Sequence, residues 1–399
     1  MSEKTIKKIP NVPNLRFNKY SDTIKKWRCS DFLNTFSTNS LSWDQLSYID
    51  ESELQNLHYG LIHNGAPTLI DCEEYQLPFI QTELKKYTLC KNGDVIFADA
   101  SEDTKDICKP VEFINTSKSK IVSGLHTIHA RDIKNLTVIG FKGYLFSSYN
   151  FHKQVHRLTQ GTKIFSINPS NFKEMFVGIP SDDEQRDIVS LLSKIDKRIA
   201  TQNKIINKLE SLICSLRSDI FSKYDWKWQS LDSFINNGTI TLKRGNVIPK
   251  HEKNEEYKFP VYSSSIHNNG LMGFNNSYMF DKELITWSVD GGGNFFYRSK
   301  HKFNVTNVCG IMEVKDNIFN YRFLSEILSA QHSKMIFDYQ TKAHPSVIEK
   351  LYKLPIVEIK TQEKIALIFE LYYQKLEKEK DILSLYKKQK AYLLQNMFI

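Results

Sequence analysis

QRDIVSLLSKIDKRIATQNKIINKLESLICSLRSDIF (residues 185–221) and QEKIALIFELYYQKLEKEKDILSLYKKQKAYLLQNMF (residues 362–398) are two copies of one helical sequence. Apolar residues in each copy alternate between spacings of four and three, which is the heptad pattern of a coiled-coil seam. Both copies interrupt the seam at the same place, with Gln202 and Glu379, and the second copy also with Lys390. The seams are Ile188, Leu192, Ile195, Ile199, Ile206, Leu209, Ile213, Leu216 and Ile220, and Ile365, Phe369, Tyr372, Leu376, Leu383, Tyr386, Leu393 and Met397.

The duplication extends beyond these helices. Lys26-Trp27, near the start of the chain, precedes a segment with Asp, Phe, an aliphatic residue and Asn in the same order as the segment that follows Lys227-Trp228. The order is therefore globular region, long helix, globular region, long helix. A long internal repeat of this kind indicates one structural module present twice.

Local sequence signals indicate where the helices and the globular regions begin and end. Ser181 and Glu184 have the spacing of a capping box and predict the start of the first helix. The globular regions contain short β-type runs broken by Gly, Asn and Pro, with helical stretches between them. We expect an α+β fold with pseudo-twofold symmetry, in which two similar globular domains alternate with two long helices that pair as an antiparallel coiled coil. The expected boundaries are 1–180, 181–222, 223–358 and 359–399.

Composition narrows the class of protein. The hydrophobic content of 41% and the charged content of 25% are typical of a soluble globular protein. No apolar run approaches the roughly 20 residues that cross a bilayer. The six cysteines are scattered without a Cys-x-x-Cys pair, and the histidines lack metal-ligand spacing. These features predict free thiols, no metal site and a cytoplasmic location.

Positive charge is concentrated in one stretch. The net charge is +9, and residues 107–173 contain 10 basic and 2 acidic side chains, whereas residues 1–106 contain 12 basic and 16 acidic ones. Histidines and aromatic residues accompany the basic side chains of this stretch. A localised basic face with such neighbours favours binding to a nucleic-acid backbone over an ordinary solvated surface.

Motifs for catalysis are missing from the sequence. A DNA amino-methyltransferase needs an Asn/Asp-Pro-Pro-Tyr/Phe loop, and Asn168-Pro169-Ser170-Asn171 lacks the second proline and the aromatic residue. No phosphate-binding Gly-x-x-x-x-Gly-Lys-Ser/Thr loop is present. Gly291-Gly292-Gly293 is interpreted as a tight turn at a DNA-facing edge, because it lacks the strand–loop–helix setting of a dinucleotide site. We therefore expect a protein that is not an enzyme.

The order of parts resembles that of the specificity (S) subunit of a type I restriction–modification system. The similarity covers essentially the whole chain and includes Asn11–Phe17, Ile179-Pro180 with Glu184-Gln185, and Leu393–Phe398. Phe259–Ser264 and Val289–Gly293 are similar to turns common in such proteins. Two departures are that Thr361 stands at the counterpart of Glu184, and that the first domain has no triple-Gly turn. The resemblance implies that the globular regions are target-recognition domains, each gripping one half of a split DNA target.

The same resemblance implies partners and cofactors. Two methyltransferase (M) subunits would dock on the helices and bring S-adenosylmethionine, and two motor-nuclease (R) subunits would add ATP- and Mg²⁺-dependent translocation and cleavage. No cofactor is expected on this chain, and no membrane partner. Alternatives are a specificity protein of another DNA-modification system, and a structural coiled-coil organiser whose globular ends bind proteins.

Candidate contact residues follow from loops rich in basic, amide and hydroxyl groups, which can contact phosphates and base edges. In a seam, polar residues fix register or mark a partner site, and we assign Gln202 and Glu379 to partner binding. The DNA-binding candidates of the first domain are Lys118, Lys120, His126, His129, Arg131, Lys142, Lys153, His156, Arg157 and Lys163. Those of the second are Lys243, Arg244, Asn246, Ser263, Ser264, His267, Asn268, Asn269, Asn294, Tyr297, Arg298 and Lys342.

Overall fold

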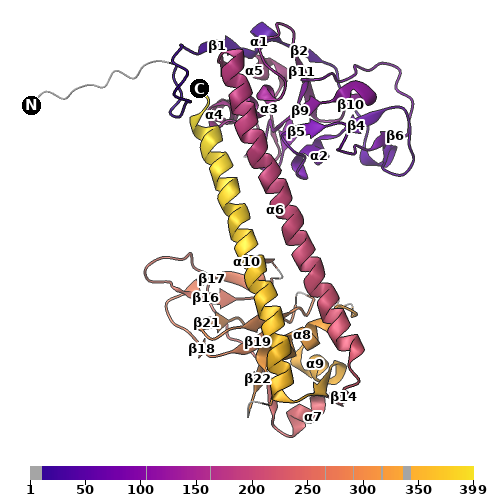
Figure 1. Cartoon of the computed structure of the whole chain (residues 1–399), viewed down its shortest axis with the longest axis vertical. Helices are drawn as coiled ribbons and strands as arrows, with labels where there is room; N and C mark the ends of the chain where they lie inside the picture. The colour runs from indigo at the N-terminus through magenta and orange to yellow at the C-terminus, as the bar shows by residue number, and fades with distance from the viewer. Residues whose placement is uncertain are drawn as a thin grey trace, which may run out of the picture. The chain divides into compact units, whose positions relative to one another are not determined.

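The computed structural model describes residues 11–104, 106–161, 163–265, 267–290, 292–315, 318–335 and 343–399. The chain divides into two compact units: residues 1–201 with 383–399, and residues 202–382. Two long helices, α6 (Asp182–Lys223) and α10 (Ile359–Asn396), contribute one part to each unit (Figure 1). Each unit thus combines a globular domain with a two-helix segment.

A five-stranded sheet forms the centre of the first unit. Its central strand, β7, is buried along its whole length, because the sheet is covered on both sides. A smaller four-stranded sheet packs beside it. The order of the first sheet is β2 (Leu33–Phe36), β11 (Thr127–Asp132), β7 (Val95–Ala98), β9 (Pro110–Ile114) and β5 (Leu69–Asp71). The order of the second is β10 (Ile121–Ser123), β4 (Gln55–Leu57), β6 (Phe79–Ile80) and β3 (Leu46–Ser47).

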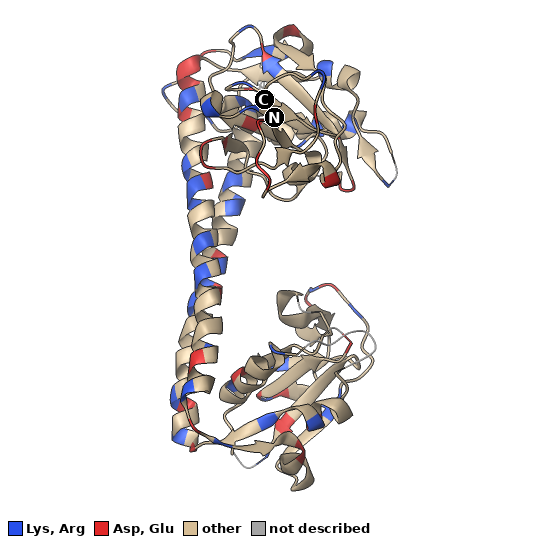
Figure 2. Ribbon diagram, turned by 90° about the vertical axis from the view of Figure 1, so that its right-hand side faces the viewer, with Lys and Arg blue, Asp and Glu red and all other residues tan. Residues whose placement is uncertain are grey.

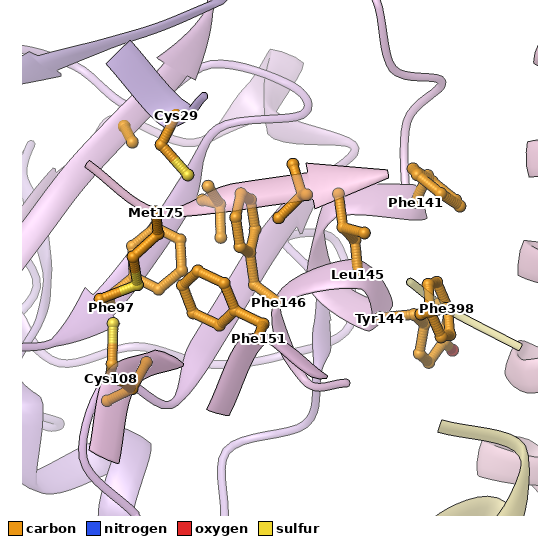
Figure 3. Packing of buried hydrophobic residues seen from close by; sticks show 14 of the residues in the cluster. Cys29, Phe97, Cys108, Phe141, Tyr144, Leu145, Phe146, Phe151, Met175 and Phe398 are labelled. Atoms are coloured by element: carbon orange, nitrogen blue, oxygen red, sulfur yellow. The ribbon is translucent and has the colours of Figure 1, made fainter. Parts of the chain in front are cut away.

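Aromatic side chains fill the core between the central sheet and the helices of this unit. The ring of Phe97 on β7 lies 5.0 Å from that of Phe146 at the end of α3 (Phe141–Phe146) and 4.7 Å from that of Phe172 on α5 (Pro169–Lys173). Phe151 of α4 (Tyr149–Leu158) joins the same cluster (Figure 3). Removing a buried ring of this kind typically costs about 3–5 kcal/mol, so this cluster is a main source of the unit's stability.

Two four-stranded sheets form the second unit. Trp287 on β19 is completely buried, and opposite it Gly310 on β22 leaves no room for a side chain, since an added Cβ would lie 2.0 Å from the indole. One sheet has the order β15 (Ile240–Arg244), β22 (Cys309–Val314), β19 (Leu284–Ser288) and β20 (Phe295–Arg298). The other has the order β17 (Leu271–Asn275), β16 (Phe259–Tyr262), β21 (Lys302–Val305) and β18 (Phe280–Asp281). The helices of this domain are α7 (Leu231–Asn236), α8 (Tyr321–His332) and α9 (Pro345–Leu351).

The internal repeat is visible in equivalent strand pairs. In the first unit β1 (Lys25–Arg28) pairs antiparallel with β13 (Phe176–Ile179), and in the second β14 (Lys227–Ser230) pairs with β23 (Lys353–Ile356). The two pairings have the same form, but the tryptophans are offset by one residue: Trp27 lies opposite Val177, whereas Trp228 lies opposite Pro355, the counterpart of Gly178. The similar Lys-Trp segments of the sequence are therefore equivalent edge strands beside the start of each long helix.

A buried glutamine fastens the start of each long helix to its domain. Gln185 and Gln362 occupy the same place in the repeat and are 0% and 1% exposed. Each amide oxygen accepts one backbone N–H, and each amide nitrogen donates to two backbone carbonyls, one of them five residues earlier in the chain. The partners are Val138, Leu136 and Pro180 for Gln185, and Asn320, Ile318 and Val357 for Gln362, all at 2.8–3.0 Å.

Glu184 differs from the capping box expected at Ser181–Glu184. Its two carboxylate oxygens accept hydrogen bonds from the guanidinium of Arg16, at 2.8 and 2.7 Å, and the side chain of Glu184 is 2% exposed. A bidentate, charge-assisted pair is stronger than a single bond to a backbone amide. Arg16 therefore ties the segment before β1 to the first turn of α6. The helix begins at Asp182, as the sequence predicts, but the Glu184 carboxylate binds Arg16 instead of forming the expected capping box.

The long helices pair antiparallel in both units. In the first unit, Ile188 and Leu192 near the start of α6 share a core cluster with Leu393 near the end of α10. The second unit joins the later part of α6 to the earlier part of α10, through Arg217 and the Tyr373 hydroxyl at 3.0 Å. Every expected seam position is buried or half-buried, and acidic and basic residues recur along both helices (Figure 2). The predicted antiparallel coiled coil is confirmed.

The polar break in the seam is a contact between equivalent residues. Gln202 donates from its side-chain amide to the Glu379 carboxylate and, at 3.0 Å, to the Glu379 carbonyl. Both side chains are 6% exposed, and Lys375 also pairs with Glu379. The two residues satisfy each other inside the second unit, so the geometry supports a role in helix register.

No helix in the described ranges has the length and apolar character needed to cross a membrane.

Changing Gln202 to Leu should lower the melting temperature, because the buried Glu379 carboxylate loses a donor. The double change Gln202→Leu/Glu379→Leu should restore it to the wild-type value or above, since an apolar pair then packs in the seam. Calorimetry of the full chain measures both, with Asn203→Leu at the neighbouring exposed position as control. A single variant as stable as the wild type would contradict the register role.

Candidate nucleic-acid interface

Seven of the ten candidates in the first domain have exposed side chains. Lys118 and Lys120 follow β9 and form ion pairs with Glu73 and Glu53, so part of their charge is already neutralised. Three others lie together on or beside the outer face of α4. The exposed set is Lys118, Lys120, His126, Lys153, His156, Arg157 and Lys163.

Two further candidates belong to one buried network around Asp94. His129 Nε2 lies 2.7 Å from Asp94 Oδ2, and Arg131 donates to both oxygens of the same carboxylate at 2.6 and 2.7 Å. His129 and Asp94 are 0% exposed, and the Arg131 side chain is 21% exposed. An exposed base contact for His129 is therefore wrong in this structure: the carboxylate from the start of β7 holds its ring inside the sheet.

Lys142 is also buried, at 2% exposure. Its ammonium lies 3.4 Å from Glu112 and donates to Thr137 at 2.9 Å. Glu112 in turn accepts the backbone N–H groups of Gly140 and Gly143 at the start of α3. Burial raises the pKa of Glu112, and Lys142 with the two amides opposes that rise. Lys142 thus neutralises a buried carboxylate that caps α3, and the predicted DNA contact is wrong.

The candidates of the second domain fall in three places. Lys243 and Arg244 lie at the end of β15, where Lys243 pairs with Glu313 and Arg244 donates to the carbonyl of Asn307 at 2.7 Å. Asn246 follows them and is exposed, whereas Asn294 and Tyr297 near β20 are half-buried. Tyr297 also donates to Glu283. Lys342 lies outside the described residues.

The remaining candidates meet in one loop, which we call the amide loop and define by its described residues, 263–265 and 267–270. His267, Asn268 and Asn269 are exposed in η3 (His267–Gly270). Asn268 and Asn269 have φ of 49° and 50°, in the left-handed region, and Gly270 follows with φ of 78°. The loop is closed by the N–H of Ser263 on the carbonyl of Gly270 at 2.7 Å. The structure therefore brings Ser263, Ser264, His267, Asn268 and Asn269 together.

Arg298 lies beneath the amide loop and is 4% exposed. Its guanidinium stacks 3.6 Å from the ring of Tyr262, and its Nε donates to Thr286 at 2.9 Å. Burial lowers the pKa of Arg298 to about 10. A side chain enclosed in this way does not present its donors to a groove, so the predicted direct base contact by Arg298 is wrong.

Sequence reasoning missed a second group of residues, the exposed apolar side chains of α10. Leu367, Leu371 and Leu385 are 60%, 58% and 63% exposed. These leucines lie outside the seam positions of the two-helix pair. Leucines at non-seam positions were the signal in the sequence that could have identified this surface. Exposed apolar residues repeated along a helix are typical of a protein contact.

Among the described residues, no three His, Cys, Asp or Glu side chains lie close enough together to bind a metal ion.

The comparisons with known proteins agree with this architecture. A family model for the type I restriction modification DNA specificity domain matches residues 76–211 and again residues 225–385. The chain belongs to this family. A solved type I restriction–modification S subunit from M. genitalium has the same fold, with a TM-score of 0.61 and 19% identity, over 97% of this chain and 99% of that one.

Curated relatives match over part of the chain. A type I specificity subunit of Mycoplasma pneumoniae, S.MpnORF289P N-terminus, is 37% identical over 141 residues, which are 33% of this chain and 72% of that protein. Another from the same organism, S.MpnORF507P, is 35% identical over 129 residues, 31% of this chain and 35% of that protein. The match thus spans about a third of the longer relative's length.

His152 on α4 gives the first unit a pH-dependent stability. Burial, and secondly the charge of His156, lowers the pKa of His152 to about 4 from 6.5. As the pH falls below 6.5, His152 becomes protonated in the unfolded chain, whereas in the folded unit it becomes protonated only near pH 4. Stability is therefore complete above pH 6.5 and lost between pH 6.5 and 4, by up to about 3 kcal/mol.

His152→Leu should flatten the fall in melting temperature between pH 7 and pH 4.5, measured by calorimetry. His156→Leu, which changes an exposed histidine of the same helix and removes only the lesser cause, serves as control and should reduce the fall only in small part. Equal pH profiles for His152→Leu and the wild type would rule out this contribution.

Proposed function

We propose that this chain is a specificity subunit of a type I restriction–modification system: it recognises a split DNA target and is not itself an enzyme. The observation that carries the proposal is that the DNA specificity domain occurs twice in series. The two copies share equivalent strand pairs and equivalent buried glutamines. Two similar reading domains on one chain suit a target with two separate halves.

In this proposal the first domain contacts the DNA phosphates through basic side chains of α4. Lys153, His156 and Arg157 lie within two turns of that helix with exposed side chains. Cations there would set affinity without reading sequence, because phosphates are the same at every base pair. In the second domain the exposed amides of the amide loop would contact base edges, where paired donors and acceptors distinguish bases.

The partners follow from the same proposal. Two M subunits would dock on the long helices and carry S-adenosylmethionine, and two R subunits would carry ATP and Mg²⁺. The exposed leucines of α10 are the surface that supports helix docking. A specificity protein of another modification system would use the same reading domains with other partners.

Methylome sequencing of a host that expresses this chain with its M subunit tests the proposal. The expected result is methylation at one bipartite sequence with an unread spacer. Methylation at a continuous sequence, or an unchanged methylome despite a stable complex, would overturn it.

Lys153→Ala should weaken binding to all DNA sequences alike and reduce the slope of log K against log salt by about one unit, as for one lost phosphate contact. Lys142→Ala should instead lower the melting temperature, because it leaves the buried Glu112 carboxylate without its cation. Salt titrations of fluorescence anisotropy and calorimetry separate the two. If Lys153→Ala changed preference among sequences, its assignment to the backbone would be wrong.

Leu371→Glu should prevent assembly with the M subunit while leaving the melting temperature of the isolated chain within a few degrees, since the side chain is 58% exposed. Val347→Glu, which introduces the same charge at an exposed apolar position of α9, is the control and should assemble normally. Size-exclusion chromatography with light scattering measures the mass of the complex. Full assembly of Leu371→Glu would remove this face of α10 from the interface.

A further inference from the structure

The amide loop contains two adjacent asparagines in a conformation that L-residues rarely adopt. Asn268 and Asn269 both lie in the left-handed region, with ψ of 43° and 31°. Residues in this region are strained, and they persist where surrounding contacts fix them. Their side chains are exposed, so the strain does not serve burial of either amide. The conformation instead holds two amide groups side by side at the surface.

Contacts from β19 and from the residue that follows β21 fix the start of this loop. Thr306 donates its N–H to the carbonyl of Tyr262 at 2.9 Å and its hydroxyl to Ser263 at 3.1 Å. The Ser288 hydroxyl donates to the carbonyl of Ser264 at 2.7 Å. On another side the loop borders a cavity of about 580 Å³, which Asn269, Arg298 and residues of α8 and α10 line. The tip of the loop therefore lacks close packing on that side.

Arg298 is the buried support next to this tip. Its Nη2 would lie 3.3 Å from a Cβ placed on Gly270, the residue that ends the left-handed run. Its guanidinium stacks on Tyr262, the residue that precedes the loop, and on Phe296 at 4.9 Å. One planar group thus contacts the strand that enters the loop and lies under the turn that leaves it.

The charge of Arg298 is costly where it lies. Among the described residues it forms no ion pair with a carboxylate, and its Nη2 has no hydrogen-bond partner. Buried arginines normally have an acidic partner, as Arg217 has in Glu326, 2.8 Å away in the same unit. An apolar side chain would fill this place at lower cost, so stability alone does not account for an arginine here.

We infer that Arg298 is a positioning residue for sequence reading: it holds the amide loop so that Asn268 and Asn269 face the major groove and read an adenine. The chemical basis is the side-chain amide, which donates to N7 and accepts from N6 of adenine as a bidentate pair. This inference rests on the proposed function and assigns the loop to the second half of the target.

The test compares sequence preference with stability in the full chain, alone and co-purified with its M subunit. Binding is measured against a panel of DNAs that changes one base pair at a time in either half-site. Arg298→Met and the double change Asn268→Ala/Asn269→Ala should lose preference at the same A·T pair, by roughly 5- to 150-fold. Preference in the first half-site should be unchanged in both. Arg298→Lys retains the charge without the planar stack and should recover only part of the preference.

Arg217→Met is the matched control, because it removes a buried arginine of the same unit that does not contact the loop. It should lower the melting temperature and leave the preference intact. Thr286→Val, which removes only the acceptor of Arg298 Nε, provides a milder variant if Arg298→Met does not fold, and should weaken preference at the same A·T pair. Unaltered preference in Arg298→Met, or in Thr286→Val when Arg298→Met does not fold, would overturn the inference. The proposed function itself fails if the wild-type chain shows no preference in either half-site.

Discussion

The contact between Gln202 and Glu379 fixes the register of the two long helices. These residues are equivalent in the repeat, and in an antiparallel pair of equivalent helices only residues at the centre of the pairing can meet their own copies. A shift of one heptad would separate the two side chains and leave two polar groups buried without each other, a cost of about 1–3 kcal/mol for each such group. The apolar seam alone opposes such shifts less strongly, because apolar positions repeat every seven residues. The polar pair therefore supplies the specificity that the seam lacks.

The repeat is preserved where the backbone requires it and changed where side chains cover the helices. Gln154 and Gln331, which are equivalent, each exchange two hydrogen bonds with the backbone of the last strand of their domain, at Phe176 and Lys353. The ion pairs beside the helices differ: Lys390 pairs with Asp196 in the first unit, whereas the second has Arg217 with Glu326. Under the proposed function, a shared frame with different side chains would let the two domains read different half-sites. The architecture thus separates support from recognition.

The amino-acid sequence predicted the helices well and the contact residues poorly, for a physical reason. A seam depends on spacing within one helix, so Ile188 or Phe369 reveals its burial through its neighbours four and three residues away. Burial of a basic residue depends on partners far along the chain: Asp94 for His129, Glu112 for Lys142, and Tyr262 for Arg298. Counting charges could not separate these from exposed cations. The amide loop was partly predictable. Asn268-Asn269-Gly270 is recognisable in the sequence as a turn, but the burial of Arg298 beneath it is not.

The surface available for phosphates is smaller than the charge count of residues 107–173 suggests. Internal pairing uses Lys142 fully and Arg131 largely, and Lys118 and Lys120 share their charge with Glu73 and Glu53. Within the described residues, Lys153, Arg157 and Lys163 form no ion pair, and they lie on α4 and just after it. Phosphate binding responds to charge that is not already neutralised, because that charge displaces counterions from DNA. Among the candidate cations of this stretch, those on and just after α4 therefore keep the charge that internal ion pairs do not neutralise.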